Sequence, residues 1–382
     1  MSSPAFHRDR LTIYSYITLA AYIWGVYGLG PALLLMRDET GMSLTVSSLH
    51  STALAIGVIL AGFIGSPTVA RFGRGGTLQL GAALASVGLL GLAIFRNPAL
   101  SIPSVVMIGV GGSIATNAMN AFFIIHHGKH APGAIGESNA GAVLAGMLSP
   151  LAMGALVAAG ANWRLALLVP VAMFAGARLY RGNANALEAQ GETHHDAGSG
   201  ALPRLYWWAW IAMLLCVATE FSFVIWSGDI MRDQAHVSTA TAASSLSAMA
   251  VGMMISRLTI ARLNRRFDIE QIFRASLVLP IVAWVPMWFS SDAMVMLALL
   301  FVIGIGLGYH FPLTLNRMLV SAPGLTDKAA TKSSLASGIA IGGSPFLLAT
   351  LSSTIGLHTA FVMVPLLLTL ALLSAIKHPV AH

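Results

Sequence analysis

Charged residues are scarce in this sequence, and their scarcity limits the kind of protein that it can encode. Asp, Glu, Lys and Arg make up 9% of the 382 residues, whereas soluble domains carry about 25%. Hydrophobic residues make up 56%, and the mean hydropathy is +0.78. A water-soluble surface cannot be built from so few charges, so the composition excludes a soluble domain and indicates an integral membrane protein.

Several other features are also missing. The single cysteine, Cys216, excludes an intramolecular disulfide. We find no phosphate-cradling nucleotide loop, catalytic triad or metalloprotease motif, so we predict neither an ATP-driven pump nor an enzyme, and no cofactor. The net charge of +7 comes from basic residues scattered between apolar stretches rather than from one patch, so nucleic acid is not an expected partner.

Apolar stretches long enough to cross a bilayer recur along the whole chain. The polar segment 181–205 interrupts them and is typical of a solvated linker. We therefore predict an N-terminal six-helix bundle in residues 1–180, the linker, and a C-terminal six-helix bundle in residues 206–382. The predicted helices cover residues 11–35, 45–70, 77–95, 102–125, 135–159, 163–180, 206–228, 240–262, 270–290, 293–317, 330–354 and 357–376.

The placement of basic residues predicts the orientation. With the N-terminus inside, 16 of the 21 Lys and Arg fall in or beside inner segments, four fall outside and one lies within a helix. This distribution follows the positive-inside rule, so we expect both termini in the cytoplasm.

The two halves of the chain resemble each other at one fixed offset. A shift of 195 residues places Arg71-Phe72 on Arg266-Phe267 and Ser149-Pro150 on Ser344-Pro345. Because such pairs seldom coincide by chance at a constant shift, we interpret the sequence as an internal duplication, which is frequent among transporters.

The loop between the second and third predicted helices runs from Ser66 to Arg74 and contains Ala70, Arg71 and Gly73. With twelve helices, a six-plus-six repeat and a polar linker, nearly the whole chain resembles the major facilitator superfamily. The signature of that superfamily for this loop is Gly, three variable residues, Asp, Arg, one variable residue, Gly, Arg. Arg71, Gly73 and Arg74 match it, whereas Ser66 and Ala70 stand where the signature has Gly and Asp.

This resemblance implies an all-α membrane fold of two six-helix bundles with pseudo-two-fold symmetry. It also implies that helices 1, 4, 7 and 10 line a central cavity and that the motif loop helps to close the inner face. We therefore predict a gating role for Arg71, Gly73 and Arg74, and for Arg266 in the second copy. Ala70 deprives the usual charge latch of its carboxylate.

Glu220 is the clearest candidate for a functional ionisable group. As the fifteenth residue of the seventh predicted helix, it lies about 20 Å from the inner boundary at ~1.5 Å per residue. An ionisable group at such depth costs at least ~2.5 kcal/mol, so it is a functional candidate by default. We predict that Glu220 takes up and releases protons; a protonated Glu220 that only bonds a neighbouring helix is the structural alternative.

Arg257 also lies within a predicted helix. By the same rise it is about 8 Å from the inner surface and more than about 10 Å from Glu220 in depth. We expect its long side chain to snorkel to the inner interface, with an anion site facing the cavity as the alternative.

Further candidates lie on the helices expected to line the cavity. Aromatic residues provide walls suited to an organic molecule, and amides either bind a solute or hold helices together. His310 is a second candidate for proton transfer, because histidine titrates near neutral pH. The predicted substrate-binding residues are Tyr22, Trp24, Tyr27, Asn117, Asn120, Phe223, Trp226, Arg257, Tyr309 and Asn316.

Together these features predict a monomeric secondary transporter of the bacterial inner membrane. It would move a small neutral or singly charged organic solute by alternating access, coupled to protons. A uniporter or exchanger is an alternative, and so is a receptor or assembly factor that moves nothing. A copper-like transporter would use thioether and imidazole ligands such as Met249, Met253, His126 and His127, but we predict no metal site.

Overall fold

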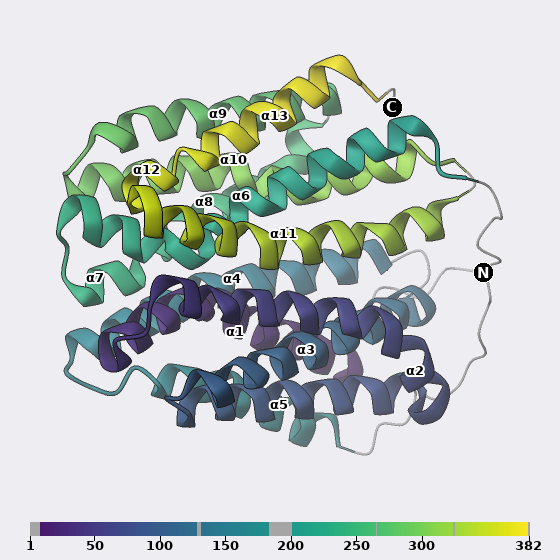
Figure 1. The fold of residues 1–382 in the computed structure, drawn as a ribbon. Coiled ribbons are helices and arrows are strands. Elements are labelled where there is room, and N and C mark those ends of the chain that lie inside the picture. The colour runs from purple at the N-terminus through teal and green to yellow at the C-terminus, as the bar shows by residue number, and fades with distance from the viewer. Residues whose placement is uncertain (1–7, 128–130, 183–200, 265, 324, 381–382) are drawn as a thin grey trace.

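The protein is described here from a computed structural model, which describes residues 8–127, 131–182, 201–264, 266–323 and 325–380. This part of the chain contains helices and no strand. Long helices run side by side between two ends of the molecule (Figure 1). We call the end at which α1 begins and α13 ends the termini side, and the opposite end the far end.

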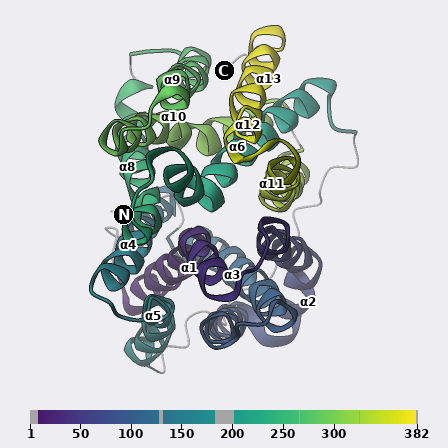
Figure 2. The same ribbon diagram turned by 60° about the vertical axis from the view of Figure 1, so that its left-hand side comes forward.

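The helices pack as two groups (Figure 2). The N-terminal helix group occupies the lower part of the view and the C-terminal helix group the upper part. The N-terminal group comprises α1 (Arg10–Thr40), α2 (Leu44–Ile94), α3 (Pro98–His127), α4 (Ala131–Ala158) and α5 (Leu165–Arg181). The C-terminal group comprises α6 (Arg204–Ala235), α7 (Thr239–Ser244), α8 (Leu246–Leu263), α9 (Ile269–Phe289), α10 (Ala293–Val320), α11 (Thr326–Ile355), α12 (Leu357–Ala360) and α13 (Met363–Lys377).

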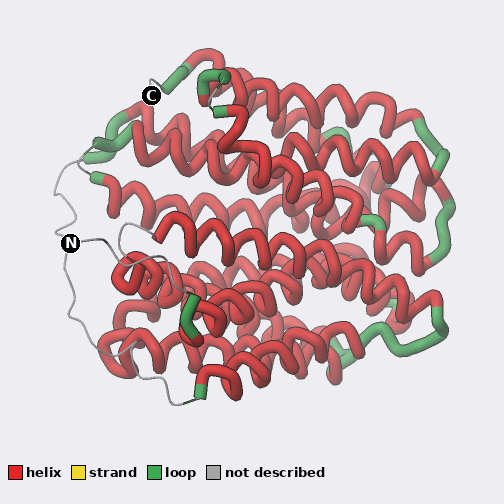
Figure 3. Tube along the Cα trace, turned by 180° about the vertical axis from the view of Figure 1, so that it is seen from behind, coloured by secondary structure: helices red, strands yellow, loops and turns green. Residues whose placement is uncertain are grey.

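These elements agree with the predicted membrane helices. The second and third predicted helices form α2, which a kink at Gly73 divides, and the eighth and twelfth each contain a break. Eleven helical segments of the described chain are long and apolar enough to cross a membrane. The 17-residue α5, the sixth predicted helix, is shorter than any of these eleven. The fold is thus all-helical, with loops gathered at the two ends (Figure 3).

Local sequence signals explain several helix ends. The side chains of Asp9 and Ser43 accept hydrogen bonds from backbone N–H groups of the first turns of α1 and α2. Gly41 ends α1 with φ of 68°, and Gly73 adopts φ of 67° at the kink in α2. Glycine adopts this conformation without the Cβ penalty of other residues, so both turns depend on it.

The same close helix crossing occurs in both groups. In α2 and α3, Gly57 lies so close to the backbone of Val106 that no Cβ would fit, and Gly252 of α8 meets the carbonyl oxygen of Phe301 in α10 in the same way. These two pairs differ by the offset of 195 residues. Small residues allow membrane helices to approach closely, so this crossing is a structural counterpart of the sequence repeat.

Contacts between the groups extend from mid-depth to the far end. Thr52 of α2 donates a hydrogen bond to the carbonyl oxygen of Gly342 in α11 at 3.1 Å. Ser247 of α8 donates to that of Met147 in α4 at 2.8 Å. Gly154, two turns further along α4, lies directly against α7. The two groups are therefore fastened to each other at the far end.

Nearer the termini side, the faces of α2 and α4 that meet the C-terminal helix group at the far end are no longer covered by it. On α2, Ile59 reaches Gly338 of α11, but Phe63, one turn further, is 76% exposed. On α4, Ala140 and Gly136 are exposed, although they continue the face that packs against α7 and α8 at the far end. The groups thus diverge toward the termini side.

Candidate functional site

A hydrogen bond between Tyr27 and Glu220 joins the two groups in the middle of the bundle. The hydroxyl of Tyr27, on α1, donates to Oε1 of Glu220, on α6, at 2.8 Å. Both residues are only 8% exposed. Glu220 lies about midway along α6, roughly 23 Å from each end at ~1.5 Å per residue. This position agrees with the predicted depth of Glu220.

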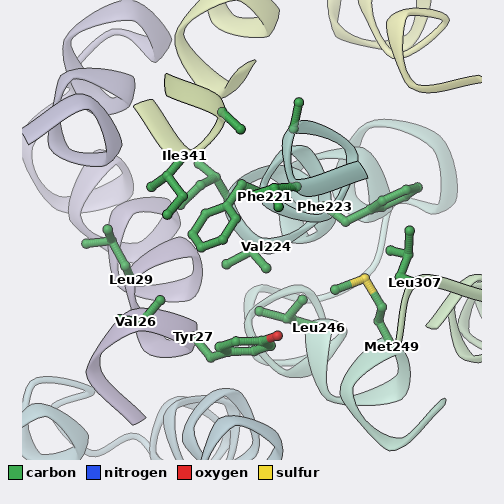
Figure 4. Packing of buried hydrophobic residues seen from close by; sticks show 14 of the residues in the cluster. Val26, Tyr27, Leu29, Phe221, Phe223, Val224, Leu246, Met249, Leu307 and Ile341 are labelled. Atoms are coloured by element: carbon green, nitrogen blue, oxygen red, sulfur yellow. The ribbon is translucent and has the colours of Figure 1, made fainter. Parts of the chain in front are cut away.

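Apolar side chains from both groups surround this hydrogen bond. The ring of Tyr27 lies against Gly146 of α4, and the Met253 sulfur of α8 is 3.6 Å from the Tyr27 hydroxyl. A polar pair in such surroundings interacts strongly because water does not screen it. Figure 4 shows the neighbouring side chains, which include Val26, Leu29, Phe221, Val224, Leu246, Met249 and Ile341.

The repeated Ser-Pro motif fixes α6 on both sides of Glu220. The hydroxyls of Ser344 and Ser222 lie 2.6 Å apart, and each is 2.8 Å from the carbonyl oxygen of Ala218. Further along, Nε1 of Trp226 donates to the carbonyl oxygen of Pro345 at 3.1 Å. Trp226, a predicted solute contact, is instead fully buried in this helix contact.

Arg257 is half-buried on α8. It interacts electrostatically with both Glu220 and Tyr27, and it lies one turn beyond Met253 on α8. Side chains of a helix lean toward its N-terminus, which for α8 is the direction of Met253 and mid-depth. The depth argument from sequence neglected this tilt; the snorkelling prediction and its anion-site alternative both stay predictions.

The other predicted aromatic contacts lie within one helix group. The ring of Tyr22 packs directly onto Gly112 of α3. Nε1 of Trp24 donates to the carbonyl oxygen of Ala166 at the start of α5, at 2.9 Å. Phe223 is fully buried with its ring against Phe361. Of the predicted aromatic residues, the structure brings only Tyr27 to Glu220.

The predicted polar residues of α10 and α3 also lie apart from Glu220. Tyr309 is hydrogen-bonded to Thr259 of α8 at 2.6 Å. Nε2 of His310 is 3.0 Å from the carbonyl oxygen of Ser276, so this ring faces α9 rather than α6. Three asparagines lie toward the termini side, with Asn117 exposed and Asn120 and Asn316 half-buried.

The candidate metal ligands have other contacts. His126 is 2.7 Å from Asp9, and His127 is 2.9 Å from Thr12, so both contact the start of α1. Met249 and Met253 are buried in the apolar core. No group of three potential metal-binding side chains was found among the residues that the structure describes.

The far end carries ion pairs that the sequence analysis missed. Arg37 of α1 forms an ion pair with Asp229 of α6 and lies over the ring of Trp226, 5.1 Å from its centroid. Asp38 accepts two hydrogen bonds of 2.8 Å from Arg232. Both pairs join the two helix groups. The tripeptide Met-Arg-Asp at 36–38 and 231–233 repeats at the offset of 195 and could have identified them.

Comparison with known proteins identifies the family. A sequence model described as Major Facilitator Superfamily matches residues 15–345, which is most of the chain. This protein belongs to the major facilitator superfamily. The family prediction made from the motif, repeat and linker is therefore confirmed.

The individual proteins that this chain resembles are distant from it in sequence. Two structures of a bacterial homologue of the human lysosomal transporter Spinster, both 13% identical, cover 98% of this chain. The inward-facing unoccupied one has a TM-score of 0.78 over 99% of its length, and the inward-facing occupied one 0.75 over 97%. "Putative metabolite transport protein YwtG" of Bacillus subtilis (strain 168) is 24% identical over 160 residues. That match spans 41% of this chain and about a third (35%) of the relative.

The superfamily motif loop lies at the termini side. Arg71 is exposed with its guanidinium over the ring of Phe72, and Gly73 forms the kink in α2. Arg74 and Asn117 line a cavity of about 260 Å³ between α2 and α3. Arg266, in the second copy, is exposed. Their gating role stays a prediction, as does the division at residues 180 and 206; most of the linker, 183–200, lies outside the described residues.

Proposed function

We propose that this protein is a secondary transporter in which Glu220 couples proton movement to that of a small neutral or singly charged organic solute. The observation that carries the proposal is the Tyr27–Glu220 hydrogen bond, because it places a buried carboxyl group between the two helix groups. Ionisable groups so deep in membrane proteins commonly serve ion or substrate pathways. Any movement of one group against the other changes the surroundings of this carboxyl group.

We further propose alternating access, with residues 1–180 and 206–382 as the two moving bodies and the motif loop as part of the inner gate. The far-end ion pairs and the uncovered faces toward the termini side support this proposal. With both termini in the cytoplasm, as the basic residues favour, the structure corresponds to an inward-facing state. The Spinster homologue structures are described as inward-facing. We place the protein as a monomer in the bacterial inner membrane.

The test is solute-induced thermal stabilisation of the purified protein over a broad panel of organic solutes, at pH 5.5 and pH 7.5. Anything that binds the native state raises the melting temperature. We expect at least one solute whose stabilising effect depends on pH in the wild type and not in Glu220→Gln. Asp292→Asn is a matched control, because Asp292 caps α10 at the far end, distant from the site.

Each outcome separates the alternatives. A pH-dependent effect that survives in Glu220→Gln would show that Glu220 is structural and would favour a uniporter or exchanger. A hit is then tested by uptake into proteoliposomes with and without a pH gradient. Saturable uptake excludes the receptor and assembly-factor alternatives, and binding without uptake would overturn the transporter proposal.

A further inference from the structure

Arg257 lies within α8, between the first and last turns of that helix. In the described part of the chain it forms no hydrogen bond and no ion pair, and its interactions with Glu220 and Tyr27 are electrostatic. By contrast, four arginines at the helix ends, Arg37, Arg164, Arg232 and Arg317, each form an ion pair with an acidic residue. An unpaired guanidinium at this depth is costly, so it indicates a binding function.

The surroundings of Arg257 suit one anionic group. Arg257 is half-buried on α8, one turn from Met253, whose sulfur contacts the Tyr27 hydroxyl. The site therefore offers one full positive charge and one hydroxyl donor from opposite helix groups. A planar guanidinium binds carboxylates with particular strength through two parallel N–H donors.

We infer that the transported solute carries one carboxylate, which pairs with Arg257 and accepts the hydrogen bond that Tyr27 now donates to Glu220. This inference rests on the proposed function and specifies its substrate class. A solute with a single negative charge needs one cation, and one is present. A solute with several negative charges would lack partners at this site.

The arrangement also links the solute to a proton. Among the residues that the structure describes, the ionisable groups that interact with Glu220 are Tyr27 from α1, Arg257 from α8 and Cys216, one turn away on α6. When a carboxylate engages Tyr27 and Arg257, Glu220 loses the two groups that stabilise its negative charge and takes up a proton. Solute anion and proton would then cross together without net charge movement.

The experiment compares carboxylates with their uncharged amides. Purified wild-type protein is titrated with acetate, propionate, lactate, pyruvate and benzoate, and with the amide of each, while the melting temperature is followed. We expect stabilisation by at least one carboxylate and none by its amide. Arg257→Gln should weaken that apparent affinity roughly tenfold or more, because it removes a charge-assisted hydrogen bond.

Two further variants keep the result interpretable. Arg262→Gln removes an exposed arginine of the same helix and should leave the carboxylate affinity unchanged. Glu220→Gln should retain the affinity or increase it, because the competing carboxylate is removed. If Arg257→Gln fails to fold, Arg257→Lys, which keeps the charge but loses the paired donors, should bind more weakly than wild type.

The outcomes also separate this inference from the proposed function. A carboxylate that binds wild type and Arg257→Gln equally overturns the inference. Stabilisation only by neutral or cationic solutes, with a pH dependence lost in Glu220→Gln, overturns it while the transporter proposal stands. Stabilisation by no solute of either panel counts against both.

Discussion

Two buried glutamates of the C-terminal helix group have very different surroundings. Glu270, at the start of α9, forms an ion pair with the fully buried Arg317 and accepts a hydrogen bond from the backbone of Val380 at 3.2 Å. Arg317 in turn donates to the carbonyl oxygen of His378 at 3.2 Å. Glu220 instead accepts a hydrogen bond from Tyr27 in the other helix group, and in the described part of the chain it forms no ion pair with Arg257.

The difference distinguishes a structural acid from a mobile one. Every bond of Glu270 named above stays within the C-terminal group, so it persists when the two groups move relative to each other. The bond of Glu220 crosses between the groups, so it breaks in such a movement. Burial alone would have assigned both residues to one class; their partners separate them.

The largest expected effect tests the structural acid. Glu270→Gln leaves the buried Arg317 cation without a compensating charge, so we expect a loss of about 3–5 kcal/mol in the free energy of unfolding. Chemical unfolding in detergent micelles measures it. The double variant with Arg317→Gln should recover more than half of the loss. A single variant within about 1 kcal/mol of wild type would contradict the structural role.

The far-end pairs extend the comparison, because they also join the two groups. Arg37→Gln removes the partner of Asp229, which lies largely buried. We therefore expect the closed arrangement of the far end to be destabilised by about 2 kcal/mol relative to an open one. A cysteine placed at the buried Ala243, in a Cys216→Ala background, should then react with maleimide more than ~10-fold faster. Arg96→Gln, at an exposed far-end loop, is the control. An unchanged labelling rate would show that this pair does not hold the far end closed.

A smaller effect on stability is expected when the Tyr27–Glu220 hydrogen bond between the two helix groups is removed. Tyr27→Phe keeps the ring and removes the hydroxyl, so we expect a loss of about 1 kcal/mol in the free energy of unfolding. In a double-mutant cycle with Glu220→Leu, which removes the acceptor, the two losses should not add, because both variants remove the same bond. Tyr309→Phe should be additive with Glu220→Leu, since Tyr309 bonds Thr259. Additivity in both cycles would argue against a significant Tyr27–Glu220 bond.

The smallest effect on stability should come from Glu220 itself. In Glu220→Gln the amide oxygen still accepts the Tyr27 hydrogen bond, and no carboxylate is buried at this position. The free energy of unfolding should therefore change by less than about 1 kcal/mol. Chemical unfolding in detergent micelles measures this change, with Glu270→Gln measured in parallel. A loss as large as that of Glu270→Gln would place both glutamates in the structural class and remove the distinction drawn here.

The helices could be predicted from sequence because a membrane allows few alternatives. Backbone groups in lipid must bond within their own helix, so apolar length alone located the long helices, although α1 and α6 end five and seven residues later than predicted. Depth follows from position along a helix, which is why Glu220 was found. The predicted helices leave residues 71–76 as a loop, and α2 is kinked there, at Gly73.

Side-chain direction could not be predicted in this way. Trp24 and Phe223 occur in the helices expected to line the cavity, but an apolar helix has no polar face to show which side meets its neighbours. The depth argument for Arg257 used its position along α8 and did not consider the lean of its side chain. The far-end pairs were missed because Asp229 and Arg232 lie near a helix end, where charges are usually solvated.

The short α5 has a consequence for the lipid around the protein. Its 17 residues span about 26 Å, less than the roughly 30 Å hydrocarbon layer of a typical bilayer. Arg164 and Arg181 directly bracket this helix and resist being drawn into hydrocarbon. The acyl chains beside α5 must therefore compress, so the protein should prefer membranes of shorter lipids and thin the bilayer along one flank.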